Sequence, residues 1–305
     1  MNLLVTGGAG FIGSHVAAAA LKGGHSVTIV DDLSSGKLTN VPENARFVKD
    51  NVCFCNWEEI LSDIDTVFHA AAFVSAPESF ECLEHCYDTN VKASWRLIKA
   101  CIAKKINKLV FCSSSAVYRE EKAPNSEADL PGPSTPYGLT KLDVEHLLAM
   151  ARQLHGFSYA ALRYFNVFGP RQDVNSDYSA VIPIFIDRAL RNTDLTIYGT
   201  GKQRRDFIYV TDVANAVLTF AQTDICGVFN VGAGTDYSIS QIADIIIRHT
   251  ASKSRIRFEP SRPGDVMFST ASLLRQREIG LWKPSISFEE GLELTIRFYR
   301  DNSDF

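Results

Sequence analysis

The sequence has no excess of basic residues and no long hydrophobic run. Its 305 residues include 31 Lys and Arg against 35 Asp and Glu, for a formal net charge of −4, and no block of Lys or Arg occurs. The positive patch expected of a nucleic-acid-binding protein is therefore missing. The most apolar stretches, such as residues 16–21, are far shorter than the roughly 20 residues of a membrane span, and no signal peptide is visible. We predict a globular, cytoplasmic protein that binds neither nucleic acid nor membrane.

The sequence also lacks the cysteine and histidine spacing of a disulfide-bonded protein or a zinc site. The seven cysteines are odd in number and irregularly spaced, which favours a reducing compartment. Two small groups, Cys53 with Cys55 and Cys82 with His85 and Cys86, have no second half at zinc-like spacing. Because free cysteine often packs as a small hydrophobic residue, we expect no metal site.

The first half of the chain alternates short apolar runs with amphipathic stretches. Predicted strands cover residues 3–6, 26–30, 66–70, 108–112 and 158–164, and predicted helices cover 14–22, 88–104 and 135–155. This alternation is typical of a Rossmann-type α/β fold with a doubly wound parallel sheet. Turn-forming residues break the pattern from residue 167, so we predict one domain over 1–166 and a smaller α/β domain over 167–305, with segments such as 207–235 returning to the first. The second domain is predicted to hold helices at 180–190, 212–222, 238–250 and 288–299 and strands at 195–198 and 228–231.

Three glycines follow the first predicted strand, in the segment GGAGFIG. Gly7 allows a tight turn, Gly10 lets a pyrophosphate approach the backbone, and Gly13 lets the helix pack on the strand. Asp31 follows the second predicted strand, where a carboxylate accepts hydrogen bonds from the adenosine ribose and repels a 2′-phosphate. The pattern predicts an NAD site, with a loop-capping role for Asp31 and Asp32 as the alternative.

A tyrosine and a lysine four residues apart, Tyr137 and Lys141, share one face of the predicted helix 135–155. An ammonium beside a phenol favours the phenolate and makes a weak acid useful as a base near neutral pH. Because free tyrosine titrates near pH 10, nearby positive charges must lower the pKa of the phenol by about three units, on the order of 4 kcal/mol. The alternative is a pair on a solvated helix face.

Together these segments resemble the extended short-chain dehydrogenase/reductase family, and most of all its nucleotide-sugar 4-epimerases of the UDP-glucose and UDP-N-acetylglucosamine type. The resemblance covers nearly the whole chain and rests on GGAGFIG, DDLSSG, KDNV, HAAA, TNV, SSSAVY, YGLTK, RYFNVFGP, RRDFIYVTDV and RPGD. It implies an NAD-binding first domain, a nucleotide-sugar-binding second domain and epimerisation at carbon 4 of a UDP-sugar through a 4-keto intermediate. It also implies a homodimer, for which the stripe Leu142, His146, Leu147 and Met150 is one candidate surface and burial within one subunit is the alternative.

The resemblance assigns roles by position. The implied catalytic residues are Ser114, Tyr137 as the base, and Lys141. The implied NAD contacts are Gly7, Gly10, Phe11, Ile12, Gly13, Asp31, Asp32, Leu33, Ser34, Ser35, Gly36, Asp50, Asn51, Ala70, Ala71, Ala72, Asn90, Tyr137, Lys141 and Phe165. The implied substrate contacts are Ser114, Ser115, Asn166, Arg205, Arg262, Asp265 and Ser269.

Several residues decide among neighbouring reactions of this family. Dehydratases generally carry an Asp-Glu pair where this chain has Ser115 and Ala116, and decarboxylases tend to keep a glutamate at the second place, so both reactions are disfavoured. An NADPH-dependent reductase conflicts with Asp31, and a non-catalytic regulator usually lacks the tyrosine or lysine. Ser269 occupies a place that limits the substituent on carbon 2 of the sugar, so N-acetylated sugars are predicted to fit. Arg119, where the family commonly has glycine, leaves a UDP-glucuronate substrate open.

Overall fold

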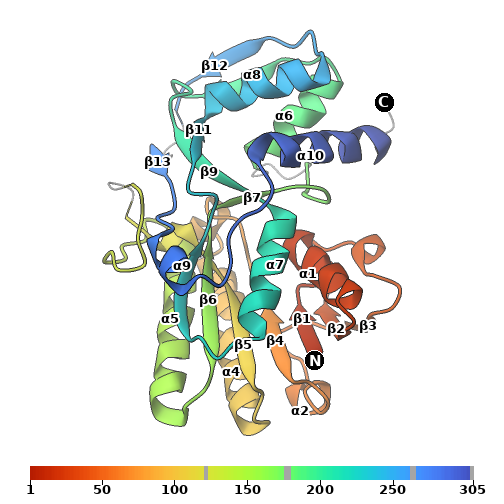
Figure 1. Cartoon of the computed structure of the whole chain (residues 1–305), viewed down its shortest axis with the longest axis vertical. Coiled ribbons are helices and arrows are strands. Elements are labelled where there is room, and N and C mark those ends of the chain that lie inside the picture. Colours follow the sequence, from red (N-terminus) through yellow and green to blue (C-terminus); the bar gives the residue numbers. More distant parts are fainter. Residues whose placement is uncertain (120–122, 175–179, 262–265, 303–305) are drawn as a thin grey trace.

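The larger lobe is built on a seven-stranded sheet in which all neighbours are parallel. In this computed structural model, which describes residues 1–119, 123–174, 180–261 and 266–302, the strand order is β3-β2-β1-β4-β5-β6-β10 (Figure 1). The strands are β1 Asn2–Thr6, β2 Ser26–Asp31, β3 Arg46–Lys49, β4 Thr66–His69, β5 Lys108–Ser114, β6 Tyr159–Tyr164 and β10 Gly227–Val231. Leu3, Leu4 and Val5 are wholly buried, as apolar runs are when helices cover both faces of a sheet. The predicted doubly wound α/β fold is confirmed.

Helices form a layer on each face of this sheet (Figure 1). One layer contains α2 Trp57–Ile60, α4 Ala93–Ala103 and α5 Pro136–His155, and the other contains α1 Phe11–Lys22 and α7 Val210–Ala221. The predicted helix 88–104 is divided, because a π-helical turn, Asp88–Lys92, precedes α4 and the short α3 Leu83–Tyr87 precedes that turn. Both α7 and β10 come after residue 167 in the chain and pack in the larger lobe.

Helix α5, which carries the tyrosine and lysine, has a strongly specified start and end. The Thr135 hydroxyl accepts a hydrogen bond from the Gly138 amide at 3.0 Å, and Pro136 occupies the first helical position. Gly156 ends the helix in the left-handed conformation, with φ of 67°. These signals place Tyr137 in the first turn, at the carboxyl edge of the sheet, where ligands bind in folds of this type.

The smaller lobe lies above that edge in Figure 1. It contains the helices α6 Val181–Leu190, α8 Ile239–Thr250 and α10 Phe288–Asn302, and the paired strands β8 Leu195–Tyr198 and β12 Ile256–Glu259. A second sheet, formed by β7 Asn166–Phe168, β9 Arg204–Tyr209, β11 Asp236–Ser238 and β13 Phe268–Ser269, connects the lobes, and α9 Leu274–Ile279 follows it. Aromatic contacts among Phe168, Phe207 and Phe288 join this sheet to the base of α10.

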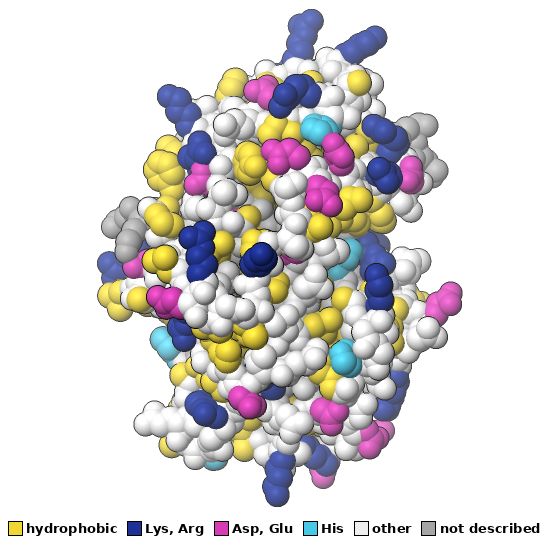
Figure 2. All heavy atoms as spheres, in the orientation of Figure 1, with side chains coloured by type: hydrophobic (Ala, Val, Ile, Leu, Met, Phe, Trp, Pro, Cys, Tyr) yellow, Lys and Arg dark blue, Asp and Glu magenta, His cyan; other side chains and the backbone are white. Residues whose placement is uncertain are grey.

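The surface carries charges of both signs. Figure 2 shows Lys and Arg interspersed with Asp and Glu on the face in view. No helix in the described part of the chain is long and apolar enough to cross a bilayer. Of the apolar stripe on α5, Leu142 is buried within the subunit while Met150 is 39% exposed, so the stripe is only partly available to a second copy. The homodimer remains a prediction.

Candidate active site

The predicted catalytic residues come together at the carboxyl end of β5. Ser114 is the last residue of this strand, and its hydroxyl lies close enough to Tyr137, in the first turn of α5, to lower the pKa of the phenol. Lys141, one turn further along, lies with Nζ 5.7 Å from the centroid of the Tyr137 ring. The Lys141 ammonium donates a hydrogen bond to the Cys112 carbonyl at 2.9 Å, which fixes it beside the tyrosine.

The electrostatics of the Tyr137 phenol differ from the expectation. Burial raises the pKa of Tyr137, the neighbouring Cys112 thiol acts in the same direction, and the hydrogen bond with Ser114 opposes them. Lys141 is only 2% exposed, its own pKa is lowered by burial, and its ammonium is directed at the Cys112 carbonyl and the Phe111 ring. In the protein alone the pKa of the phenol lies above its ordinary value, and its lowering by nearby positive charges stays a prediction.

The glycine loop is closely packed where the sequence predicts it to be. Gly7 adopts φ of 69°, and a Cβ at this position would lie 2.7 Å from the Ala71 amide nitrogen, at the end of β4. A Cβ at Gly13 would lie 2.1 Å from the Gly7 carbonyl oxygen. Glycine is therefore required at both positions, because the loop, helix α1 and the 70–72 segment approach one another at backbone contact distance.

Replacing Gly13 with Ala is expected to weaken NAD binding by at least about tenfold and to lower the thermal midpoint, because the added Cβ forces the Gly7 carbonyl to move and overpacking costs about 1–3 kcal/mol. Calorimetric titration with NAD and thermal unfolding measure the two effects. Gly23→Ala is the matched control, since its Cβ would meet no atom closer than 3.4 Å. Unchanged affinity and stability in the Gly13 variant would contradict this account of the loop.

Asp31 holds the glycine loop and the following segment in place. Its carboxylate is 7% exposed and accepts hydrogen bonds from the Ala9 amide at 2.9 Å and the Leu33 amide at 2.8 Å. The Lys37 amide donates to the Ala9 carbonyl at 3.0 Å, so the Asp31-to-Gly36 segment folds back on the glycine loop. Since each carboxylate oxygen has a second lone pair, Asp31 can also accept hydrogen bonds from ribose hydroxyls.

The residues present fit a dinucleotide. Helix α1 starts at Phe11 behind Gly10, with no side-chain cap and no acidic residue in its first turn, so its N-terminal dipole is available to a pyrophosphate. Asp32 accepts from Asn51 at 2.7 Å, which joins the segment after β2 to the segment after β3 that begins at Asp50. Ser34 and Ser35, which follow in the same segment after β2, are exposed. The predicted NAD residues on β1, β2, β3 and β4 thus converge on one edge of the sheet.

The side chains of two predicted cofactor residues, Asn90 and Phe165, are buried and contact other parts of the protein. The Asn90 side chain is 2% exposed, accepts from the Phe73 amide at 2.7 Å, and donates to the Phe73 carbonyl at 3.0 Å and the Thr140 hydroxyl at 2.9 Å. Asn90 therefore links the segment after β4, at Phe73, to Thr140 on α5. Phe165 is 1% exposed and packs in an apolar cluster with Tyr118 and Leu142.

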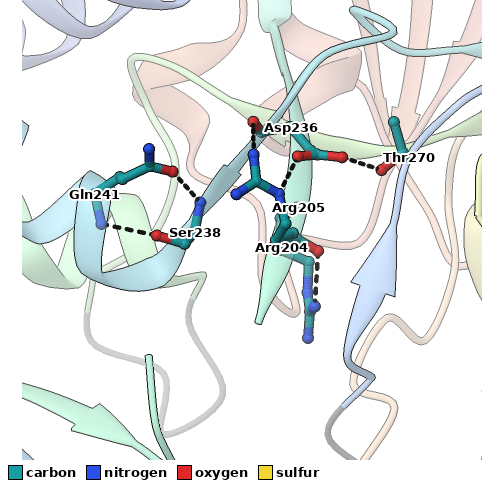
Figure 3. Close-up of polar contacts among 6 residues, drawn as sticks. All are labelled: Arg204, Arg205, Asp236, Ser238, Gln241 and Thr270. Atoms are coloured by element: carbon teal, nitrogen blue, oxygen red, sulfur yellow. Dashed lines mark hydrogen bonds and ion pairs between the residues drawn. The ribbon is translucent and has the colours of Figure 1, made fainter. Parts of the chain in front are cut away.

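Three of the predicted substrate residues, Asn166, Arg205 and Ser269, lie on the sheet between the lobes, whereas Ser114 and Ser115 lie at the end of β5. Ser269 on β13 pairs with Arg205 on β9, which places both on one face of that sheet. Figure 3 shows the Arg205 side chain directed away from that of Arg204, which bonds to Asp236. The Asn166 amide on β7 donates to the Asp206 carbonyl at 2.9 Å. Arg262 and Asp265 lie outside the described residues.

A cavity of about 770 Å³ opens on the Arg204 side of the connecting sheet. Its lining includes Arg204, Asp236 and Thr270, and it contains none of the predicted catalytic or substrate residues. The cavity therefore does not coincide with the predicted catalytic residues around Tyr137.

Sequence reasoning missed a buried polar network behind the catalytic residues. Glu145 and Arg163 form an ion pair with side-chain exposures of only 3% and 4%. Glu145 also accepts a hydrogen bond from Ser113, the neighbour of Ser114. The available signal was the position of Glu145 four residues after Lys141 and eight after Tyr137, which puts a carboxylate on the same helix face.

The glycine loop, the uncapped start of α1 and Asp31 form an arrangement that fits a dinucleotide. A family model described as the NAD dependent epimerase/dehydratase family matches residues 3–232. The chain belongs to this family and is an NAD-dependent enzyme.

Individual relatives span the chain almost completely. A putative UDP-glucose 4-epimerase of Methanocaldococcus jannaschii is 34% identical over 99% of both chains. A UDP-N-acetyl-alpha-D-glucosaminuronate decarboxylase of Bacillus cytotoxicus is also 34% identical, over 98% of this chain and 97% of the relative. Among solved structures, the UDP-N-acetylglucosamine 4-epimerase of Methanobrevibacter ruminantium, in complex with UDP-N-acetylmuramic acid, has a TM-score of 0.95 and 40% identity over 99% of both chains. The UDP-glucose 4-epimerase of Thermus thermophilus, in complex with NAD, has a TM-score of 0.93 and 33% identity over 99% of this chain and all of that one.

Proposed function

We propose that this protein interconverts a UDP-sugar and its carbon-4 epimer through a transient 4-keto sugar. The observation that carries the proposal is the placement of Ser114, Tyr137 and Lys141 together at the end of β5, followed by Ser115 and Ala116 instead of acidic residues. A tyrosine and a serine suffice to move one proton at one sugar hydroxyl. Elimination of water needs a further acid and base, which this segment lacks.

The chain's own residues account for the proton transfers. Tyr137, as phenolate, takes the proton of the 4-hydroxyl while the hydrogen on carbon 4 leaves as hydride, and Ser114 hydrogen-bonds the same oxygen. NAD, when bound, supplies the hydride acceptor and, in its oxidised form, a positively charged ring. Once the 4-keto sugar has turned over, Tyr137 would return the proton to the same oxygen as carbon 4 is reduced again, so one residue would serve both directions of proton transfer. No atom is gained or lost over the cycle.

Lys141 and Arg205 supply positive charge at two different places. Lys141 is buried beside Tyr137 and, in this proposal, would hold the nicotinamide ribose. Arg205 points from β9 toward the face shared with Ser269, where a guanidinium fork suits a diphosphate. The relatives named for UDP-glucose and UDP-N-acetylglucosamine epimerisation support a UDP-sugar as the substrate class.

The direct test incubates the NAD-loaded protein separately with UDP-glucose, UDP-N-acetylglucosamine and UDP-glucuronate, and follows the anomeric proton of each sugar by NMR. The expected result is conversion of at least one sugar to its 4-epimer without loss of carbon dioxide or water. A decarboxylated or dehydrated product in place of any epimer would overturn the proposal in favour of the reactions of other family members.

Replacing Ser269 with Tyr is expected to lower kcat/KM for UDP-N-acetylglucosamine by about tenfold or more, while that for UDP-glucose changes little. The bulky ring on the Arg205 face crowds an N-acetyl group on carbon 2, whereas the small serine leaves room. Ser240→Tyr, on α8, is the control for a new tyrosine in the same lobe. Equal losses for both sugars would show that Ser269 does not select the substituent.

A further inference from the structure

The Glu145 carboxylate links α5 to the end of β5. It lies about two helical turns beyond Tyr137 and is 3% exposed. One oxygen accepts from the Ser113 hydroxyl at 2.5 Å and from Arg163 Nε at 2.9 Å. The other accepts from Arg163 Nη2 at 2.6 Å. The residue before Ser114 is therefore bonded to the same helix that carries Tyr137.

The other end of the catalytic segment is held by the same network. Arg163 Cζ lies 4.7 Å from the centroid of the Tyr118 ring, in cation–π geometry. The Tyr118 hydroxyl donates to Asn230 Oδ1 on β10 at 2.6 Å. Asn230 in turn donates to the carbonyls of Asn125 at 2.8 Å and Ser272 at 3.3 Å. Residues 113–118 are thus fixed at both ends by buried groups, with Ser114 between them.

We propose that Ser113 is a positioning residue that, through Glu145 and Arg163, holds the Ser114 hydroxyl against Tyr137. This inference rests on the proposed roles of Ser114 and Tyr137. Buried hydrogen bonds to an ionised pair are short and directional, so they suit the fixing of a hydroxyl within a fraction of an ångström. The bond from Lys141 on α5 to the Cys112 carbonyl on β5 is a second tie between the same two elements.

A purely structural role and a positioning role have different consequences. A structural bond lost at Ser113 lowers the free energy of unfolding and leaves the ionisation of Tyr137 alone. A positioning bond lost there moves Ser114, whose hydrogen bond is the interaction that lowers the pKa of Tyr137. Misplacement of a catalytic group by about 1 Å costs up to about 100-fold in rate.

The test compares wild type with Ser113→Ala in the NAD-loaded protein. Titration of Tyr137 is followed by NMR with ring-¹³C tyrosine, and the Tyr137→Phe spectrum assigns the signal among the 10 tyrosines. We expect the midpoint to rise and kcat at pH 7 to fall about 10- to 100-fold, with KM and NAD affinity within about twofold. Ser113→Thr, which keeps the hydroxyl, should restore both. If the alanine variant does not fold, Ser113→Cys keeps the volume and weakens the donor.

Thr295→Val is the matched control, because it removes a buried hydroxyl that donates to the Gly291 carbonyl at 2.6 Å in α10. It should match wild type in kcat and in the Tyr137 titration. A Ser113→Ala protein with the wild-type titration and kcat would overturn the positioning role. If wild type converts none of the three sugars, the proposed reaction fails, and the Tyr137 titration still decides the role of Ser113.

Discussion

Replacing Tyr137 with Phe is expected to lower the kcat of epimerisation by about 10²- to 10⁴-fold, the range contributed by a positioned general acid-base group. The phenol is the group next to Ser114 that can accept the proton from the sugar hydroxyl, and phenylalanine keeps the ring while removing that oxygen. Because the glycine loop and Asp31 are untouched, NAD affinity should remain within about twofold. Turnover is measured by NMR of the sugar and NAD binding by calorimetric titration.

The control for this prediction is Tyr159→Phe. Tyr159 is 7% exposed and begins β6, at the opposite edge of the sheet from Tyr137. Its variant should keep wild-type kcat. A Tyr137→Phe protein that retains more than about a tenth of the wild-type rate would show that another group moves the proton.

Because burial raises the pKa of Tyr137, we expect the ionisation of this tyrosine to depend on whether NAD is bound. Burial raises the pKa of the phenol in the protein alone, although the Lys141 ammonium lies 5.7 Å from the centroid of its ring. Ionisation of Tyr137 therefore needs positive charge beyond what these residues supply. The expected consequence is that the phenolate forms in the NAD-bound site, where it is useful, and not at pH 7 in the bare protein.

Most strands of the larger lobe could be predicted from the sequence because they are short, almost continuously apolar runs. Apolar runs such as residues 3–6 and 26–30 are buried on both faces, so no periodicity has to be resolved. The connecting sheet was not predicted: β7 and β11 have three residues each and β13 has two. Strands this short are defined by pairing with β9, and that pairing is a tertiary fact which local sequence does not contain.

The site was predictable in its outline and not in its electrostatics. The spacing of Tyr137 and Lys141 on one helix face follows from local rules, whereas Ser114 was assigned by the resemblance to the family and lies at a strand end in the structure. The buried network depended on which strands are neighbours. Only the pairing of β5 with β6 brings Arg163 opposite Ser113, and this register makes Glu145 a shared partner instead of a helix-surface carboxylate.

Replacing Arg163 with Met is expected to lower the free energy of unfolding by about 3–5 kcal/mol, because it leaves the Glu145 carboxylate buried without its cation. Denaturant unfolding at fixed NAD concentration measures the loss. Arg191→Met is the control for a half-exposed pair: Arg191 and Asp187 are 51% and 26% exposed, so about 0–1 kcal/mol is expected.

The double variant Glu145→Leu with Arg163→Met separates stability from catalysis. Removing both charges replaces the ion pair with apolar side chains of similar size, which often recovers most of the stability. The Ser113 hydroxyl and the Tyr118 ring would still lack their partners, so kcat should stay low even where unfolding returns toward wild type. A double variant as unstable as Arg163→Met alone would contradict the burial argument. One that recovers both stability and kcat would show that the ion pair serves the fold and not the alignment of Ser114 with Tyr137.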